Sequence, residues 1–336
     1  MDEPAIIATP QVPTATPEAP KDEAPMPVTW AEYRATAVLL AFFVANILLA
    51  IVFVSPFLDA GLQAFEDPED IGNSLWYIVL ILAFTFLILY IAKKGKKWLI
   101  RAIILFAVGT TVAYVAYPVF WITLGWTFNT SVAVALVAAA GCVLALYKHP
   151  EWYVIDAVGL LVASGSAAVF GISLGILPTV LLLVALAVYD AIAVYRTKHM
   201  LSLADTVIEL RLPVLLVIPK VANYRFRDDA AKFKQATESN KGEREAMFMG
   251  LGDLVMPTIL VVSALQFGPQ WVLDFDGRGI NVASLGAAIG TLVGFGLLMG
   301  YVLKGRPQAG LPLLNGGSIV GFLAGVYWAT GSLVFW

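Results

Sequence analysis

The chain has 336 residues, of which 60% are hydrophobic and 13% are charged. Soluble proteins carry about 45–50% apolar and about 25% charged residues, so this composition excludes a soluble globular domain. Apolar segments of about 20 residues recur along the sequence, and each is long enough to cross a bilayer core of about 30 Å. The net charge of −3 is too small to imply a nucleic-acid partner. The sequence therefore predicts an all-α integral membrane protein that crosses the lipid bilayer many times.

The first 30 residues differ from the rest of the chain. Residues 1–30 are rich in proline, threonine, alanine and glutamate and contain few large apolar side chains. Such a composition buries too little apolar surface to offset the loss of chain entropy, so we predict a disordered tail. A basic segment followed by an apolar core is missing, and we therefore do not expect a signal peptide.

Nine apolar segments predict nine transmembrane helices. Six fall within residues 31–195 and three within residues 247–336. Between them, residues 196–246 form a polar loop that contains one short apolar segment, 212–218. This segment has about a third of the length of a span, so it is expected to lie at the interface or to re-enter partway. The nine predicted spans are 35–54, 71–92, 99–124, 128–147, 152–171, 176–195, 247–267, 282–303 and 311–335.

Lysine and arginine are concentrated on one side of this arrangement. Twenty of the 21 basic residues fall in the tail or in alternate loops, and only Arg278 falls on the other side. The loop between the first two spans carries five acidic residues and no basic one. Because cytoplasmic loops carry the excess of positive charge, the N-terminus and the 196–246 loop are predicted to be cytoplasmic and Trp336 to lie outside.

Cysteine and histidine are too scarce for several kinds of chemistry. Cys142 is the only cysteine, so an internal disulfide is excluded. His149 and His199 lie beside lysines of the predicted loops, outside the apolar segments. A zinc site of the His-Glu-x-x-His kind is therefore missing, and so is a histidine at membrane depth that would activate a serine nucleophile. We predict no metal site and no cofactor.

Two aspartates interrupt neighbouring predicted spans. Asp190 lies near the end of the span 176–195, and Asp253 lies near the start of the span 247–267. At 1.5 Å per helical residue, both carboxyls are expected roughly 7–9 Å inside the cytoplasmic boundary. An ionisable group costs at least ~2.5–3.5 kcal/mol at the centre of a membrane helix, so both aspartates are candidate functional residues. Asp156, four residues into its span, is interpreted as an interfacial residue rather than a third catalytic acid.

Two carboxyls in contact cannot both ionise, so such a pair shares one proton. The ionised member can take a proton from water while the protonated member polarises a peptide carbonyl, as in aspartic proteases. The same buried carboxylates would serve a proton-coupled small-solute transporter. Carriers of that kind often consist of two similar halves, and no repeat relates the two halves of this chain. From the residues alone, both alternatives stay open.

Glycine and proline lie close to these candidates. Gly250 and Gly252 lack a side chain, which lets another backbone approach Asp253. Pro312 stands at the start of the last span, where it removes a backbone donor and fixes φ. Taken alone, this is the pattern of an ordinary first helical turn. We also expect that the bend leaves backbone groups of residues 312–314 unpaired, so that an extended substrate can use them.

Three short motifs, taken in chain order, resemble those of the presenilin and signal peptide peptidase family. They are Tyr189-Asp190, Gly250-Leu251-Gly252-Asp253 and Pro312-Leu313-Leu314. The family motifs read Tyr-Asp, Gly-x-Gly-Asp and Pro-Ala-Leu, so Leu313 departs from them by replacing alanine. Prepilin peptidases also contain Gly-x-Gly-Asp, but a lysine is expected two residues later, where this chain has Val255.

The resemblance implies an intramembrane aspartyl endopeptidase that hydrolyses peptide bonds within substrate transmembrane helices. It implies that Asp190 and Asp253 are the catalytic pair and that the other motif residues shape the substrate cleft. These other residues are Tyr189, Gly250, Leu251, Gly252, Pro312, Leu313 and Leu314. The implied partners are transmembrane-helix proteins or peptides, and the implied location is a cell membrane if the chain is microbial. Presenilin works in a multi-subunit complex, and the sequence leaves accessory subunits open.

The predicted orientation is testable by labelling. Cysteines introduced at Lys234 and Asn281 should react with a membrane-impermeant thiol reagent from opposite sides of the membrane, because one span separates the two loops. Reaction of both positions from the same side would show that the number of spans between them is wrong.

Overall fold

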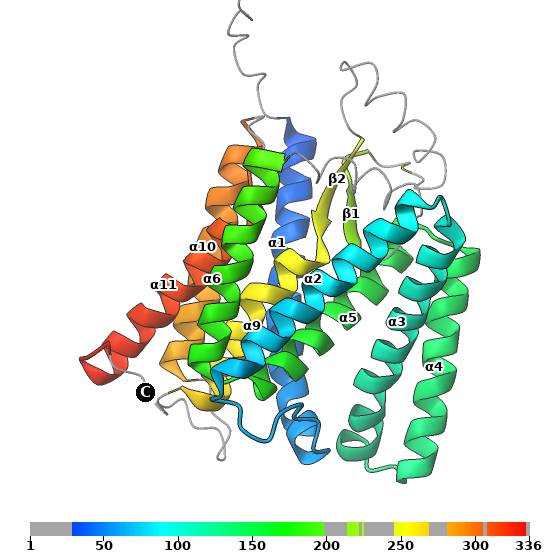
Figure 1. Ribbon diagram of the computed structural model, residues 1–336, viewed down its shortest axis with the longest axis horizontal. Helices are drawn as coiled ribbons and strands as arrows, with labels where there is room; N and C mark the ends of the chain where they lie inside the picture. Colours follow the sequence, from blue (N-terminus) through cyan, green and yellow to red (C-terminus); the bar gives the residue numbers. More distant parts are fainter. Residues whose placement is uncertain are drawn as a thin grey trace, which may run out of the picture.

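A computed structural model describes residues 29–197, 214–221, 224, 245–268, 281–304 and 308–333. These residues form nine α-helices and two short strands (Figure 1). Nearly all of the predicted tail 1–30 and most of the predicted loop 196–246, including Lys234, lie outside the described residues. The predictions of a disordered tail and a polar loop therefore stay predictions.

Each predicted span overlaps one of these nine helices. The helices are α1 (Trp30–Asp59), α2 (Ile71–Lys93), α3 (Lys97–Pro118), α4 (Phe128–Lys148), α5 (Trp152–Ser173), α6 (Ile176–Ile192), α9 (Leu251–Phe267), α10 (Val282–Val302) and α11 (Gly310–Thr330). Short π-helical segments, Val119–Thr123 and Ala193–Thr197, extend α3 and α6. Eight helices are long and apolar enough to cross a membrane, whereas α9, with 17 residues, is shorter.

Helix α9 lies at the centre of the molecule. It contacts α1, α5, α6, α10 and α11, whereas α3 and α4 stand side by side, away from α10 and α11 (Figure 1). Every residue of α9 from Pro257 to Ala264 is buried. A helix that is apolar on all sides is stable only when protein or lipid surrounds it, and here protein does so. Helix α9 therefore fixes the positions of the helices around it.

Polar side chains connect neighbouring helices to α9. The Asn46 amide on α1 donates hydrogen bonds to the Leu254 carbonyl (3.3 Å) and the Thr258 hydroxyl (3.0 Å). The Ser318 hydroxyl on α11 donates to the Pro257 carbonyl at 3.3 Å. Because these groups are buried away from water, each hydrogen bond satisfies a polar atom that would otherwise be costly to bury.

Two short strands come before α9 in the chain, and β2 ends directly at its start. The sequence predicted only helices and loops here. Strand β1 (Leu215–Pro219) pairs antiparallel with β2 (Ala246–Gly250), with Leu215 opposite Gly250. Both strands lie at the end of the molecule where α1 begins (Figure 1). The Leu251 N–H continues the ladder with a hydrogen bond of 3.1 Å to the Val214 carbonyl.

This sheet corrects the start of one predicted span. Residues 215–218 of the apolar segment 212–218 belong to β1, and the place of that segment at the interface or partway into the membrane stays a prediction. The span predicted to begin at 247 begins as a strand. Helix α9 starts only at Leu251, after Gly250 in an extended conformation (φ −65°, ψ 137°). Short apolar runs fit a strand or a helix equally well, so periodicity could not decide between them.

Helices α10 and α11 pack through glycine. A Cβ on Gly286, Gly290 or Gly294 would overlap a backbone carbonyl oxygen of α11, and a Cβ on Gly317 or Gly321 would overlap one of α10. Glycines four residues apart share one helix face, so the two backbones approach closely along their length. This packing places the first turn of α11, which follows α10 after a short connection.

Alanine at Gly290 should therefore destabilise the protein. The added methyl would overlap the Gly317 carbonyl, and overpacking of this kind typically costs about 1–3 kcal/mol. The matched control is Gly296→Ala on the same helix, because no atom lies within 4 Å of a Cβ there. Thermal unfolding in detergent should show a lower Tm for Gly290→Ala and no decrease for Gly296→Ala. Equal Tm values would contradict tight α10–α11 packing.

Candidate active site

Asp190 lies near the end of α6 and is only 4% exposed. Its Oδ2 accepts a hydrogen bond of 3.1 Å from the Leu311 N–H, in the first turn of α11. The first amides of a helix have no partner within the helix, and its N-terminus favours negative charge. The first turn of α11 and the Asp190 carboxyl therefore satisfy each other.

Asp253 lies in the first turn of α9 and is half-buried. Both of its carboxyl oxygens are 3.2 Å from the position that a Cβ on Gly310 would occupy. The two carboxyls are close enough to interact electrostatically. The structure thus brings Asp190 and Asp253 together around residues Gly310 and Leu311, on three helices that are distant in sequence. The backbone that approaches Asp253 is that of Gly310.

Pro257, four residues after Asp253, changes the hydrogen bonding of α9. In a regular helix the N–H of residue 257 would donate to the carbonyl of residue 253. Proline has no N–H, so the Asp253 carbonyl has no helical donor at this position. A hydrogen bond from outside the helix also holds the first turn of α9, because the Leu251 N–H donates to the Val214 carbonyl.

The start of α11 corrects the interpretation of Pro312. Helix α11 begins at Gly310, with Ala309 as N-cap, so residues 312–314 are helical. Pro312 is in the first turn, where the missing N–H has no helical partner to lose. The Leu311 amide in this turn donates to Asp190, so it is not left available to a substrate.

The other residues of the three motifs fall into two groups. Leu251 and Leu314 are buried, and Leu313 packs partly buried against the same apolar cluster, which also contains Leu216 and Met249 of the strands. Tyr189 is 48% exposed, and Gly252 is exposed, with no atom within 4 Å of the position that a Cβ would take there. The first group is therefore part of the apolar packing that includes the strands, whereas Tyr189 and Gly252 lie at the surface of the described part of the chain.

Two buried polar residues make contacts that the sequence did not predict. Asn315 directly follows the third motif, is buried, and donates from Nδ2 to the Leu183 carbonyl at 3.0 Å, which ties α11 to α6. Asp156 is 2% exposed, and its Oδ1 accepts a 2.8 Å hydrogen bond from the Val217 N–H of β1. A polar group within an apolar span was the available signal for both.

Within the described ranges, no group of three or more His, Cys, Asp or Glu side chains is placed to hold a metal ion. Among the described residues, two carboxyls meet here, Asp190 and Asp253, beside the Leu311 amide and Gly310. Such a pair is suited to holding and moving a proton.

Comparisons with known proteins agree on one family. The family model described as signal-peptide peptidase, presenilin aspartyl protease matches residues 40–330. A solved structure of a presenilin family intramembrane aspartate protease in the C222 space group is 37% identical, with a TM-score of 0.64, over 87% of this chain and 99% of that one. A second, in the P2 space group, is 38% identical, with a TM-score of 0.62, over 87% and 97%.

A comparison with curated proteins gives no match. The family model nevertheless covers most of the chain, and both solved structures align over most of its length with more than a third of the residues identical. The chain therefore belongs to the family of signal-peptide peptidase and presenilin aspartyl proteases.

Proposed function

We propose that this protein is an intramembrane aspartyl endopeptidase that cleaves peptide bonds within substrate transmembrane helices, with Asp190 and Asp253 as its catalytic pair. One observation carries the proposal: two carboxyls from separate helices meet at Gly310–Leu311. The family and the solved structures are intramembrane aspartate proteases, which supports the same reading. The transporter alternative gains no support from them.

The reaction needs one proton shared between the two carboxyls. The ionised carboxylate takes a proton from a water molecule, and the resulting hydroxyl attacks the peptide carbonyl carbon. The protonated carboxyl donates a hydrogen bond to the carbonyl oxygen. The carboxyl that took the proton from water then gives it to the amide nitrogen as the C–N bond breaks. The Leu311 amide contributes by stabilising negative charge on Asp190.

A substrate helix must unwind locally before its carbonyls reach the pair. Unpaired backbone groups in lipid cost several kcal/mol each, so the enzyme must supply replacement hydrogen bonds. The β1–β2 sheet supports this step, because β2 ends at Gly250, directly before the helix that carries Asp253. A substrate segment in extended form would find partners in a sheet at this position.

The remaining motif residues receive roles that follow from their surroundings. Tyr189 and Gly252, which are exposed and directly precede Asp190 and Asp253 in the sequence, are proposed to contact the substrate. Gly250, Leu251 and the leucines after Pro312 are proposed to hold the cleft in shape from behind. We also propose nine membrane crossings with a cytoplasmic N-terminus and an outer C-terminus, as the lysine and arginine distribution predicts.

Substitution of either aspartate should abolish proteolysis. Asp190→Asn or Asp253→Asn keeps the shape of the side chain but removes half of the pair, so cleavage of a transmembrane peptide should fall at least about a thousandfold. Asp59→Asn, an exposed site at the end of α1, is the matched control and should leave cleavage unchanged.

The assay compares purified variants with and without an aspartyl-protease transition-state inhibitor, and the Tm of each variant reports folding. Substantial turnover by a well-folded Asp190→Asn or Asp253→Asn protein would overturn the catalytic assignment. Proton-driven solute uptake without peptide cleavage by the unaltered protein would favour the transporter.

Gly310 should tolerate no side chain. A Cβ there would lie 3.2 Å from both Asp253 oxygens, so alanine must displace the carboxyl by a few tenths of an ångström. Misplacement of a catalytic group lowers turnover, and we expect kcat to fall about tenfold to a hundredfold. Gly316→Ala, on the same helix with no atom within 4 Å of its Cβ, should keep the normal kcat. Similar kcat values for the two variants would contradict this geometry.

A further inference from the structure

Asp156 is a buried carboxyl that the proposed reaction does not use. It lies on α5 and is 2% exposed, among apolar neighbours that include Ile155, Val158 and Val217. Its Oδ1 accepts the Val217 N–H at 2.8 Å, whereas its Oδ2 is buried without a hydrogen-bond partner in the part of the chain that the structure describes. Burying a carboxyl with one unpaired oxygen is costly, so the hydrogen bond from Val217 indicates the structural role of Asp156.

That contact is made on the edge of β1 that faces away from β2. In an antiparallel ladder, alternate residues direct both backbone groups to the partner strand. The hydrogen bonds Lys220 N–H to Glu245 carbonyl and Leu251 N–H to Val214 carbonyl show that the even-numbered residues face β2. The backbone N–H of Val217 therefore points away from β2 and toward α5, where it donates to Asp156 Oδ1. Pro219, the next residue on this edge, has no N–H to offer.

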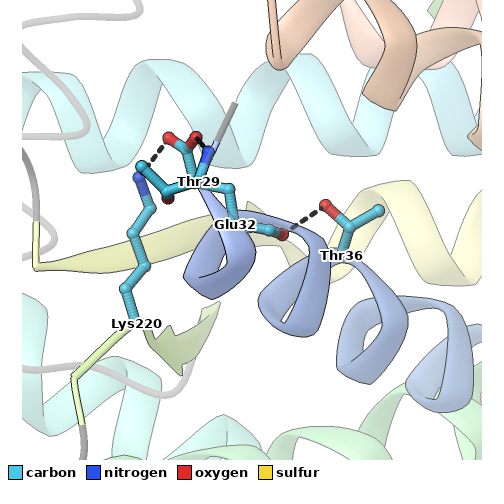
Figure 2. A network of polar contacts seen from close by, with 4 residues as sticks. All are labelled: Thr29, Glu32, Thr36 and Lys220. Carbon is cyan, nitrogen blue, oxygen red and sulfur yellow. Dashed lines mark hydrogen bonds and ion pairs between the residues drawn. The ribbon is translucent and has the colours of Figure 1, made fainter. Parts of the chain in front are cut away.

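Strand β1 has a second, weaker anchor at its end. The Lys220 ammonium donates to Glu32 Oε1 at 2.9 Å, and the Arg34 guanidinium donates to the Lys220 carbonyl at 2.9 Å. Glu32 is itself held in the first turn of α1, where its carboxylate accepts the Thr29 N–H and its carbonyl accepts the Thr36 hydroxyl (Figure 2). These groups are partly exposed to solvent, and exposed ion pairs contribute little. Asp156 is the buried anchor.

Strand β1 is connected to the helical turn that carries Asp253 by a few backbone hydrogen bonds. Leu215 is paired with Gly250, and the Val214 carbonyl binds the Leu251 N–H, the first residue of α9. Asp253 lies in the same first turn. A displacement of β1 relative to α5 therefore moves the start of α9 with it, because the ladder fixes the register between them.

We propose that Asp156 is a positioning residue: its carboxyl holds strand β1 against α5 and, through the β1–β2 ladder, sets the first turn of α9 that carries Asp253. Its effect on turnover rests on the proposed proteolytic function, whereas its hold on β1 does not. The same contact leaves one edge of the sheet without free donors, because the Val217 N–H is bound to Asp156 and Pro219 has no N–H. An added strand could not pair regularly along this edge.

Two variants at position 156 separate the hydrogen bond from mere packing. Asp156→Leu has a similar size but no acceptor, and Asp156→Asn retains a carbonyl oxygen that can accept the Val217 N–H. We expect the leucine variant to lose kcat by about tenfold to a hundredfold. The asparagine variant should stay within about threefold of the unaltered protein, since it keeps the bond.

A matched control removes a buried hydrogen bond elsewhere. The Ser74 hydroxyl on α2 donates to the Pro178 carbonyl of α6 at 2.6 Å, far along α6 from Asp190. Ser74→Ala should lower the Tm without changing kcat, whereas a positioning role predicts a loss of kcat in Asp156→Leu even well below its Tm. Loss of Tm alone in Asp156→Leu would show that Asp156 only stabilises the fold and would overturn the proposal.

Amide hydrogen exchange tests the anchor without any substrate. In Asp156→Leu, exchange should accelerate in the peptides that cover 214–219 and 246–253, and it should stay slow in Asp156→Asn. Unchanged exchange in the leucine variant would overturn the anchor even if proteolysis is confirmed. Accelerated exchange in a protein that cleaves no peptide in any form would instead retain the anchor and reject the proposed function.

A variant on the strand side gives an independent test. Val217→Pro deletes the N–H that Asp156 accepts and leaves the pairing with β2 intact, because Val217 faces away from β2. Val217→Pro should reproduce the loss of kcat and the faster amide exchange. It keeps the test possible if Asp156→Leu fails to fold. Equal losses in the asparagine and leucine variants, or normal turnover in Val217→Pro, would rule out the hydrogen bond as the cause.

Discussion

The hydrogen bond between the Asp190 carboxyl and the Leu311 amide, in the first turn of α11, is the contact on which the site depends. A helix start away from water leaves amides without partners, and a carboxyl away from water needs donors, so each requirement meets the other. Asp190 and Leu311 satisfy both at 3.1 Å. The contact fixes α6 relative to α11, and because Gly310 has no side chain, Asp253 of α9 fits against the same turn. The N-terminal turn of α11 therefore lies against both carboxyls.

Smaller polar contacts hold the three helices in that arrangement. Asn315, one turn into α11, bonds to the Leu183 carbonyl of α6, and Ser318, almost one turn further, bonds to the Pro257 carbonyl of α9. Asn46 holds α9 from the side of α1. These side chains would be costly to bury unpaired, so each also specifies which helix faces which. Apolar packing alone would allow the helices to slide, whereas these bonds are satisfied in only one register.

Sequence reasoning located the helices and the two aspartates, because long apolar runs and ionisable residues within them are strong local signals. It missed the β1–β2 sheet, since residues 215–219 and 246–250 are short apolar runs whose pairing partner lies beyond a polar loop. It also misplaced the effect of Pro312, because a proline in a first helical turn and a proline that bends the chain look alike in sequence. Asp156 was read as interfacial, since nothing local shows that a strand comes to lie against α5.

The glycine contacts between α10 and α11 have a mechanical consequence. Where side chains interdigitate, helices can shift by changing rotamers, but backbone packed on backbone offers no rotamers to change. Gly286, Gly290 and Gly294 meet α11 in this way along most of its length. A shift of α10 along α11 would therefore press backbone atoms into one another, so we expect these two helices to move together.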